Sequence, residues 1–226
     1  MITDFRPARH PDDLPGVERL LSLSDNVVAF ALTLLVLQVK VPSLSQVADP
    51  TSASNLATQL AKQTGQLVTY VISFYVIAQF WLTHYRVFRH MTGHREGLAW
   101  WNFAFLFTIT VMPFTSNLLG EYSSNALAVD IFAVNLLLAI LATRILVEFG
   151  RRRDLLAGDI DAREVRALRV RAAAVVTVVA VSAGLAWVNP TAAKFCWVLI
   201  PVVQWASEHR RPRPASRSDP SGTPGQ

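Results

Sequence analysis

The chain has 226 residues, of which 52% are hydrophobic and only 16% are charged. Soluble domains carry about 25% charged residues, so this composition excludes an ordinary soluble domain and predicts an all-α integral membrane protein in a lipid bilayer. The formal net charge is +5, but the basic residues lie in short segments between apolar runs. They therefore indicate membrane topology rather than a nucleic-acid partner.

Six apolar runs follow one another along the chain, at residues 24–41, 66–83, 98–119, 126–147, 172–188 and 191–206. Most reach the roughly 17–25 residues that a membrane-spanning helix needs, and the last is marginal. None alternates between apolar and polar residues, as the strands of a β-barrel do. We expect a short N-terminal segment at 1–18, a six-helix transmembrane domain at 19–208 and a disordered tail at 209–226.

The basic residues predict the orientation. With six spans, every arginine lies on one side of the membrane, and only Lys40, Lys62 and Lys194 lie on the other. The positive-inside rule places the arginine side in the cytoplasm, together with both termini. No signal-peptide cleavage site follows the first apolar run, so that run is expected to remain as a span. The sequence thus predicts a multi-pass protein of the plasma (inner) membrane.

The first run has one distinctive face. At about 100° per residue, a single face of the predicted helix carries a set of mainly apolar side chains with two polar ones. These are Asn26, Phe30, Thr33, Leu34, Leu37 and Val41. Asp25 points away from that face, toward neighbouring helices. An acidic residue inside a span is costly, so its presence indicates a function or a specific partner.

Polar residues of three spans are predicted to meet at the cytoplasmic end. Asp25 lies near the start of the first run, His84 ends the second and Asn102 begins the third. We expect an Asp25–His84 pair with Ser24 and Asn102 nearby. Two interpretations stay open, a structural brace that joins the helices and a proton relay.

Several of these segments resemble one family. Residues 19–25 read Arg-Leu-Leu-Ser-Leu-Ser-Asp and resemble the Arg-x-x-x-Phe-Ser-Asp signature of the lysosomal potassium channel family (transmembrane protein 175) and its prokaryotic homologues. Segments 31–42, 80–90 and 112–122 are similar to the first helix and to the ends of the second and third helices of that family. The resemblance extends over about residues 16–208.

The resemblance implies a homotetramer of six-helix subunits in which the first helix of each lines the pore. It places a hydrophobic constriction at Phe30, Leu34 and Leu37 and a hydroxyl at Thr33. Together with Asn26, at the cytoplasmic end of the same face, Thr33 is an expected polar or selectivity residue of the pore. Arg19, Ser24, Asp25, His84 and Asn102 would brace the cytoplasmic end. K⁺ is the expected permeant ion, together with Rb⁺ and Cs⁺. The chain has no Thr-Val-Gly-Tyr-Gly filter.

Two residues depart from the family pattern. Leu23 stands where the signature has Phe, and Phe30 stands where the first constriction position is Ile or Leu. The second departure makes ion selectivity less certain to predict than the fold.

A transporter and a non-conducting scaffold are the alternatives to a channel. A proton-coupled or other secondary transporter would show inverted repeats and broken helices, and a non-conducting scaffold would tolerate polar substitution at Leu34. The loops are short and carry no nucleophile or metal-ligand set, and the lone Cys196 cannot form an intrachain disulfide. We therefore expect no enzyme activity, no cofactor and no bound metal beyond ions in transit.

Overall fold

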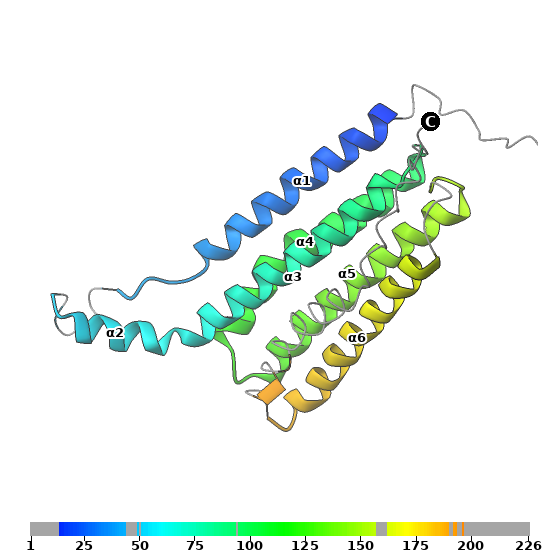
Figure 1. Ribbon diagram of the computed structural model, residues 1–226. Helices are drawn as coiled ribbons and strands as arrows, with labels where there is room; N and C mark the ends of the chain where they lie inside the picture. Colours follow the sequence, from blue (N-terminus) through cyan, green and yellow to red (C-terminus); the bar gives the residue numbers. More distant parts are fainter. Residues whose placement is uncertain are drawn as a thin grey trace, which may run out of the picture.

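The computed structural model describes residues 14–43, 49, 51–93, 95–156, 162–189, 192, 193 and 196. For residues 14, 15, 96 and 162–172 the description covers the backbone alone. Within these ranges the fold is all-helical. The helices are α1 (Leu14–Leu37), α2 (Ala53–Lys62), α3 (Thr64–Arg89), α4 (Glu96–Glu121), α5 (Ala126–Arg152) and α6 (Ala162–Ala186). All except α2 run side by side in one bundle (Figure 1).

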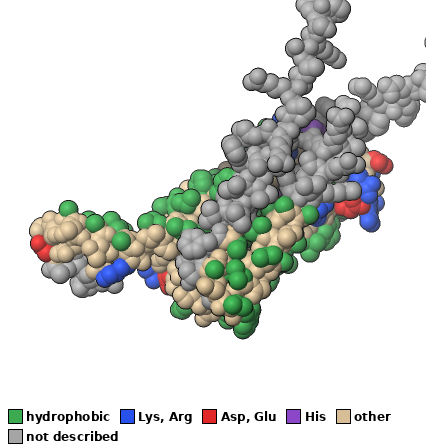
Figure 2. All heavy atoms as spheres, turned by 60° about the horizontal axis from the view of Figure 1, so that its bottom comes forward, with side chains coloured by type: hydrophobic (Ala, Val, Ile, Leu, Met, Phe, Trp, Pro, Cys, Tyr) green, Lys and Arg blue, Asp and Glu red, His purple; other side chains and the backbone are tan. Residues whose placement is uncertain are grey.

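In the part of the chain that the structure describes, four helices are long and apolar enough to cross a membrane, and they coincide with the first four predicted runs. The segments are Gly16–Leu37, Thr64–Arg89, Gly97–Glu121 and Ala126–Arg152. Only between 22% and 50% of each apolar segment is buried inside the subunit. Hydrophobic side chains accordingly cover much of the visible surface of the bundle (Figure 2). Apolar surface of this kind requires lipid or another subunit as its neighbour.

The later part of the chain differs from the prediction. Helix α6 begins at Ala162, ahead of the predicted fifth run, and its apolar part is the shorter segment Ala173–Ala186. Residues 162–171, which belong to a charged connection with a helical pattern in the sequence, are therefore part of this helix. Most of the predicted sixth run, the tail 209–226 and the first 13 residues lie outside the described residues.

A short helix lies where the sequence indicated only a loop. Helix α2 follows Ser52 and contains no buried residue; its Leu56 and Leu60 side chains are 42% and 43% exposed. It projects away from the bundle beyond the end of α1 (Figure 1). At 10 residues it is too short to span a bilayer, so the loop between α1 and α3 forms an arm at the predicted outer end.

The core of the bundle lies between α1, α3, α4 and α5. Leu35 of α1, Ile77 of α3, Ile109 of α4 and Leu136 of α5 are almost completely buried in one cluster. A second cluster, which includes Phe88 and Leu98, lies at the predicted cytoplasmic end. Because lipid tails are as apolar as these side chains, close packing rather than exclusion of water stabilises the bundle within the bilayer.

The loops at the predicted cytoplasmic end contact one another. The backbone N–H of Thr92, after α3, donates to the carbonyl of Leu155, after α5, at 2.7 Å, and the Thr92 hydroxyl donates to the same oxygen at 3.0 Å. These bonds fix the end of α3 against the end of α5.

Candidate pore face and polar network

Helix α1 buries one face and leaves the opposite face uncovered. Ser24, Val28, Ala31 and Leu35 are at most 3% exposed and pack against α3 and α4. The opposite face carries Asn26, Phe30, Thr33 and Leu37, all exposed, with Phe30 at 64% and Leu37 at 77%. Intrasubunit packing therefore does not explain the apolar residues of this face.

Two members of the predicted face lie differently. Leu34 is half-buried, so it lies at the margin of the exposed face rather than at its centre. Val41 lies beyond the helix, because α1 ends at Leu37. The N–H groups of Gln38 and Val39 bond back to the carbonyls of Leu35 and Val36 in a final turn, and Pro42 prevents the helix from continuing.

The hydroxyl of Thr33 is partly committed to its own helix. Its Oγ1 donates to the carbonyl of Phe30 at 2.8 Å. The hydroxyl hydrogen is thereby used, and the oxygen lone pairs on the exposed face stay available as acceptors. An oxygen in this position is suited to coordinate a partly hydrated cation.

The predicted polar residues of α1, α3 and α4 form a buried network centred on Asn102. The Nδ2 of Asn102 donates to Ser24 Oγ at 3.0 Å, and Ser24 Oγ donates to the carbonyl of Leu20 at 2.7 Å. The Oδ1 of Asn102 lies 2.7 Å from His84 Nε2. Ser24 and Asn102 are 0% exposed and His84 is 1% exposed. One side chain of α4 thus joins α1 to α3.

The His84 ring is enclosed by two aromatic side chains and the Asn102 amide. Its ring stacks on Phe88 and Phe105, with centroids 4.2 and 4.7 Å apart. In the orientation of the Asn102 amide that this network gives, Oδ1 accepts a hydrogen bond from His84 Nε2. The Nδ1 atom of the ring is buried and has no hydrogen-bond partner among the described residues.

Asp25 does not form the predicted hydrogen-bonded pair with His84. Its Oδ1 instead accepts from Trp81 Nε1 at 2.7 Å. Trp81 lies one turn before His84 on α3, and an indole N–H inside a bilayer needs an acceptor. Sequence reasoning missed Trp81, although a tryptophan inside the second run was a usable signal. Arg19 is exposed and makes no contact with the network in the described part of the chain.

Further polar contacts join the helices elsewhere. At the predicted outer end, Lys40 pairs with Glu121 of α4 at 2.5 Å. In the middle of the bundle, Asn135 Nδ2 of α5 donates to the carbonyl of Thr108 at 3.1 Å, one turn before Pro113. No group of three or more His, Cys, Asp or Glu that could hold a metal ion occurs within the described ranges.

The fold and its uncovered apolar faces define a helical membrane protein, and comparison with known proteins identifies its family. The model of the endosomal/lysosomal potassium channel TMEM175 family matches residues 19–113, which include most of α1, the polar network and Pro113. A potassium channel of Chamaesiphon minutus is 30% identical over 154 residues, covering 66% of this chain and 74% of the relative. A potassium channel of Streptomyces collinus is 30% identical over 176 residues, covering 76% of this chain and 82% of the relative. The chain belongs to the TMEM175 channel family.

Two further comparisons bear on the fold and on the ion. The crystal structure of a lysosomal potassium-selective channel TMEM175 homologue from Chamaesiphon minutus has a TM-score of 0.69, with 24% sequence identity. The match covers 85% of this chain and 98% of the Chamaesiphon minutus chain, and it confirms the overall fold. The human endosomal/lysosomal proton channel TMEM175 is 28% identical over 137 residues, which cover 58% of this chain but 26% of the human protein.

Proposed function

We propose that this chain is the subunit of a potassium-permeable channel whose pore is lined by the exposed face of α1 in a homotetramer. The observation that carries the proposal is the apolar face of α1, where Phe30 and Leu37 remain 64% and 77% exposed within the described part of the subunit. Four copies of this face around an axis would form a narrow apolar passage. Chains of similar length in the family carry the name potassium channel, which supports K⁺ as the permeant ion.

The proposed closed state follows from the chemistry of that face. Rings of Phe30, Leu34 and Leu37 exclude water, and a dry constriction bars ions. A small outward movement of α1 admits a partly hydrated ion, and the free lone pairs of the Thr33 hydroxyls replace part of its water. Because no cage of backbone carbonyls surrounds the ion, selectivity for K⁺ over Na⁺ is modest, and Rb⁺ and Cs⁺ also pass.

The proposed orientation puts the N-terminus of α1 in the cytoplasm. Arg86 and Arg89 end α3, and Arg151 and Arg152 end α5, at the same end of the bundle. Lys40 and Lys62 lie near the opposite end. This split of basic residues follows the positive-inside rule, so Asn26 would form the cytoplasmic mouth and Leu37 the outer end of the constriction.

A flux assay tests the proposal. The purified protein is reconstituted in liposomes under a K⁺ gradient, and K⁺, Na⁺ and H⁺ fluxes are measured separately for the natural chain and for Leu34→Ala. We expect K⁺ flux to exceed Na⁺ flux, and Leu34→Ala to increase both because the constriction widens. Saturation at low turnover would indicate a transporter, and H⁺ flux without K⁺ flux would indicate a proton channel. No flux from folded tetramers of either protein would favour a scaffold.

A further inference from the structure

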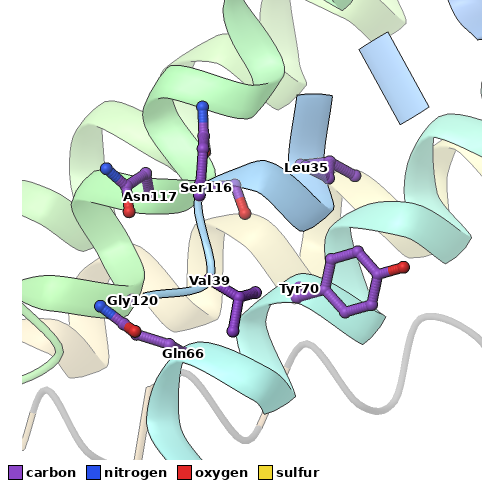
Figure 3. Close-up of a pocket in the computed structure, with 8 residues that line it drawn as sticks. Leu35, Val39, Gln66, Tyr70, Ser116, Asn117 and Gly120 are labelled. Atoms are coloured by element: carbon purple, nitrogen blue, oxygen red, sulfur yellow. The ribbon is translucent and has the colours of Figure 1, made fainter. Parts of the chain in front are cut away.

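A small polar pocket lies at the predicted outer end of the bundle, between α1, α3 and α4 (Figure 3). Gln38, just after α1, lines it together with Gln66 of α3 and with Ser116, Asn117 and Gly120 of α4. It is remote from the Ser24–Asn102–His84 network at the other end of α1, and neither the polar network nor the proposed pore uses it.

Two buried acceptors in this pocket lack a donor. Neither Gln38 Oε1 nor Gln66 Oε1 has a hydrogen-bond partner among the described residues. A buried amide oxygen without a donor is unfavourable, and nearly all such atoms in folded proteins are paired with protein or with ordered water. Gln38, just after α1, and Gln66, in the first turn of α3, line the same pocket, so one donor placed there can serve both oxygens.

The size and charge of the pocket select the ligand. The centre of a water molecule has about 10 Å³ available, which is close to the room that one bound water needs. The lining side chains carry no charge, and Glu121, beside Gly120, is already paired with Lys40. A cation would therefore lose its hydration without a free carboxylate in compensation, whereas a water can donate one hydrogen to each amide oxygen.

We propose that one water molecule binds in this pocket and donates to the side-chain oxygens of Gln38 and Gln66. It joins the residue that follows Leu37 to the first turn of α3, and so fixes the end of α1. Gly120 keeps the site compact, because a Cβ there would lie 3.3 Å from Gln66 Cγ. The proposal stands whether or not the channel conducts K⁺.

Methionine substitutions test the site, because methionine has nearly the length of glutamine without its polar atoms. The thermal midpoint of the purified protein in nanodiscs is measured for Gln38→Met, Gln66→Met and the double variant. Each single variant should lower the midpoint by about 2–4 °C, because the water and the remaining oxygen lose a partner. The double variant should cost less than the sum. Gln79→Met, half-buried on α3 away from the pocket, is the matched control.

Three outcomes of the thermal measurements would overturn the proposal. If either single variant raises the thermal midpoint, the glutamine oxygens have no hydrogen-bond partner to lose. If the double variant lowers the midpoint by the sum of the two single losses, the two oxygens do not share a partner. A midpoint that changes when K⁺ is replaced by Na⁺ or by an organic cation in the natural chain, but not in Gln38→Met, would identify a cation. Independently of the variants, a high-resolution electron cryomicroscopy map should show a solvent peak about 3 Å from both oxygens; a direct contact between the two amides contradicts the water.

Discussion

Asn102 has the most connections of the predicted site residues. It uses both ends of its amide, one toward Ser24 on α1 and the other toward His84 on α3. These side chains are almost fully buried, so without the amide His84 Nε2 would lose its partner, and Ser24 Oγ would keep only its bond to the Leu20 carbonyl. The network thus depends on Asn102 more than on the acidic residue that first draws attention in the sequence.

Replacement of Asn102 by leucine should destabilise the subunit by about 1–3 kcal/mol, because Ser24 and His84 stay buried without their partner. Thermal unfolding in nanodiscs measures the effect. Asn55→Leu on the projecting helix α2 is the control and should leave the midpoint nearly unchanged. Equal midpoints for both variants would show that the network contributes nothing to stability.

Asp25 should tolerate loss of its charge better than loss of its oxygen. Asp25→Asn keeps an oxygen that accepts the Trp81 indole N–H, whereas Asp25→Leu leaves that N–H buried without an acceptor. We expect the yield of assembled protein on size-exclusion chromatography to stay high for Asp25→Asn and to fall for Asp25→Leu. The opposite order would mean that the charge itself, and not the Trp81 bond, is required.

The position of each polar residue in the sequence predicted its depth in the membrane but not its hydrogen-bond partner. Ser24, His84 and Asn102 could be placed at one level because they lie at corresponding ends of predicted spans. The choice between His84 and Trp81 as the partner of Asp25 depends on how α1 and α3 are rotated against each other. Hydropathy and spacing do not define that rotation, since α3 is apolar on most of its surface.

At the scale of the elements, long apolar helices were predictable and their ends were not. Runs of span length identified α1, α3, α4 and α5, because a bilayer requires such runs. The helix α2 is short and amphipathic, and the start of α6 is charged, so neither has the signal that a search for apolar runs detects. The exposed face of α1 was predicted from helical periodicity, although its end at Leu37 excludes Val41.

The packing of α4 on α5 depends on a glycine. A Cβ at Gly97 would lie 2.6 Å from Cζ of Phe149, closer than side-chain contacts allow. Gly97→Ala should therefore lower the thermal midpoint by displacing the Phe149 ring. In a Phe149→Leu background the same substitution should cost less, because the shorter side chain leaves room. Equal losses in both backgrounds would place the cost in the backbone of Gly97 rather than in this contact.

At the scale of the whole molecule, the described part of the subunit leaves large apolar side chains uncovered on several helices. Beyond Phe30 and Leu37 of α1, α4 exposes Trp100 at 76%, Phe107 at 68% and Phe114 at 64%. Lipid covers such surfaces readily, but the uncovered face of α1 also carries Asn26, whose amide groups lipid would not satisfy. The proposed association of several copies around α1 would remove this face from lipid.

Measuring the mass of the assembly tests whether four chains associate. Native mass spectrometry of the protein released from nanodiscs should give four chains of 25.0 kDa each. The Phe30→Glu variant should weaken the assembly, because four carboxylates would meet in an apolar passage. A stable monomer for the natural chain would exclude a pore formed by several copies of α1.

Thiol accessibility during flux tests most directly whether α1 lines the pore. Cys196 is the only cysteine, so Cys196→Ser provides a background in which Leu37→Cys and Thr33→Cys are introduced singly, with Val134→Cys, 54% exposed on α5, as the control. A water-soluble charged thiol reagent should stop K⁺ flux through the two α1 variants and leave the control conducting. If mass spectrometry shows Leu37→Cys fully labelled while flux continues unchanged, the exposed face of α1 does not line the ion pathway.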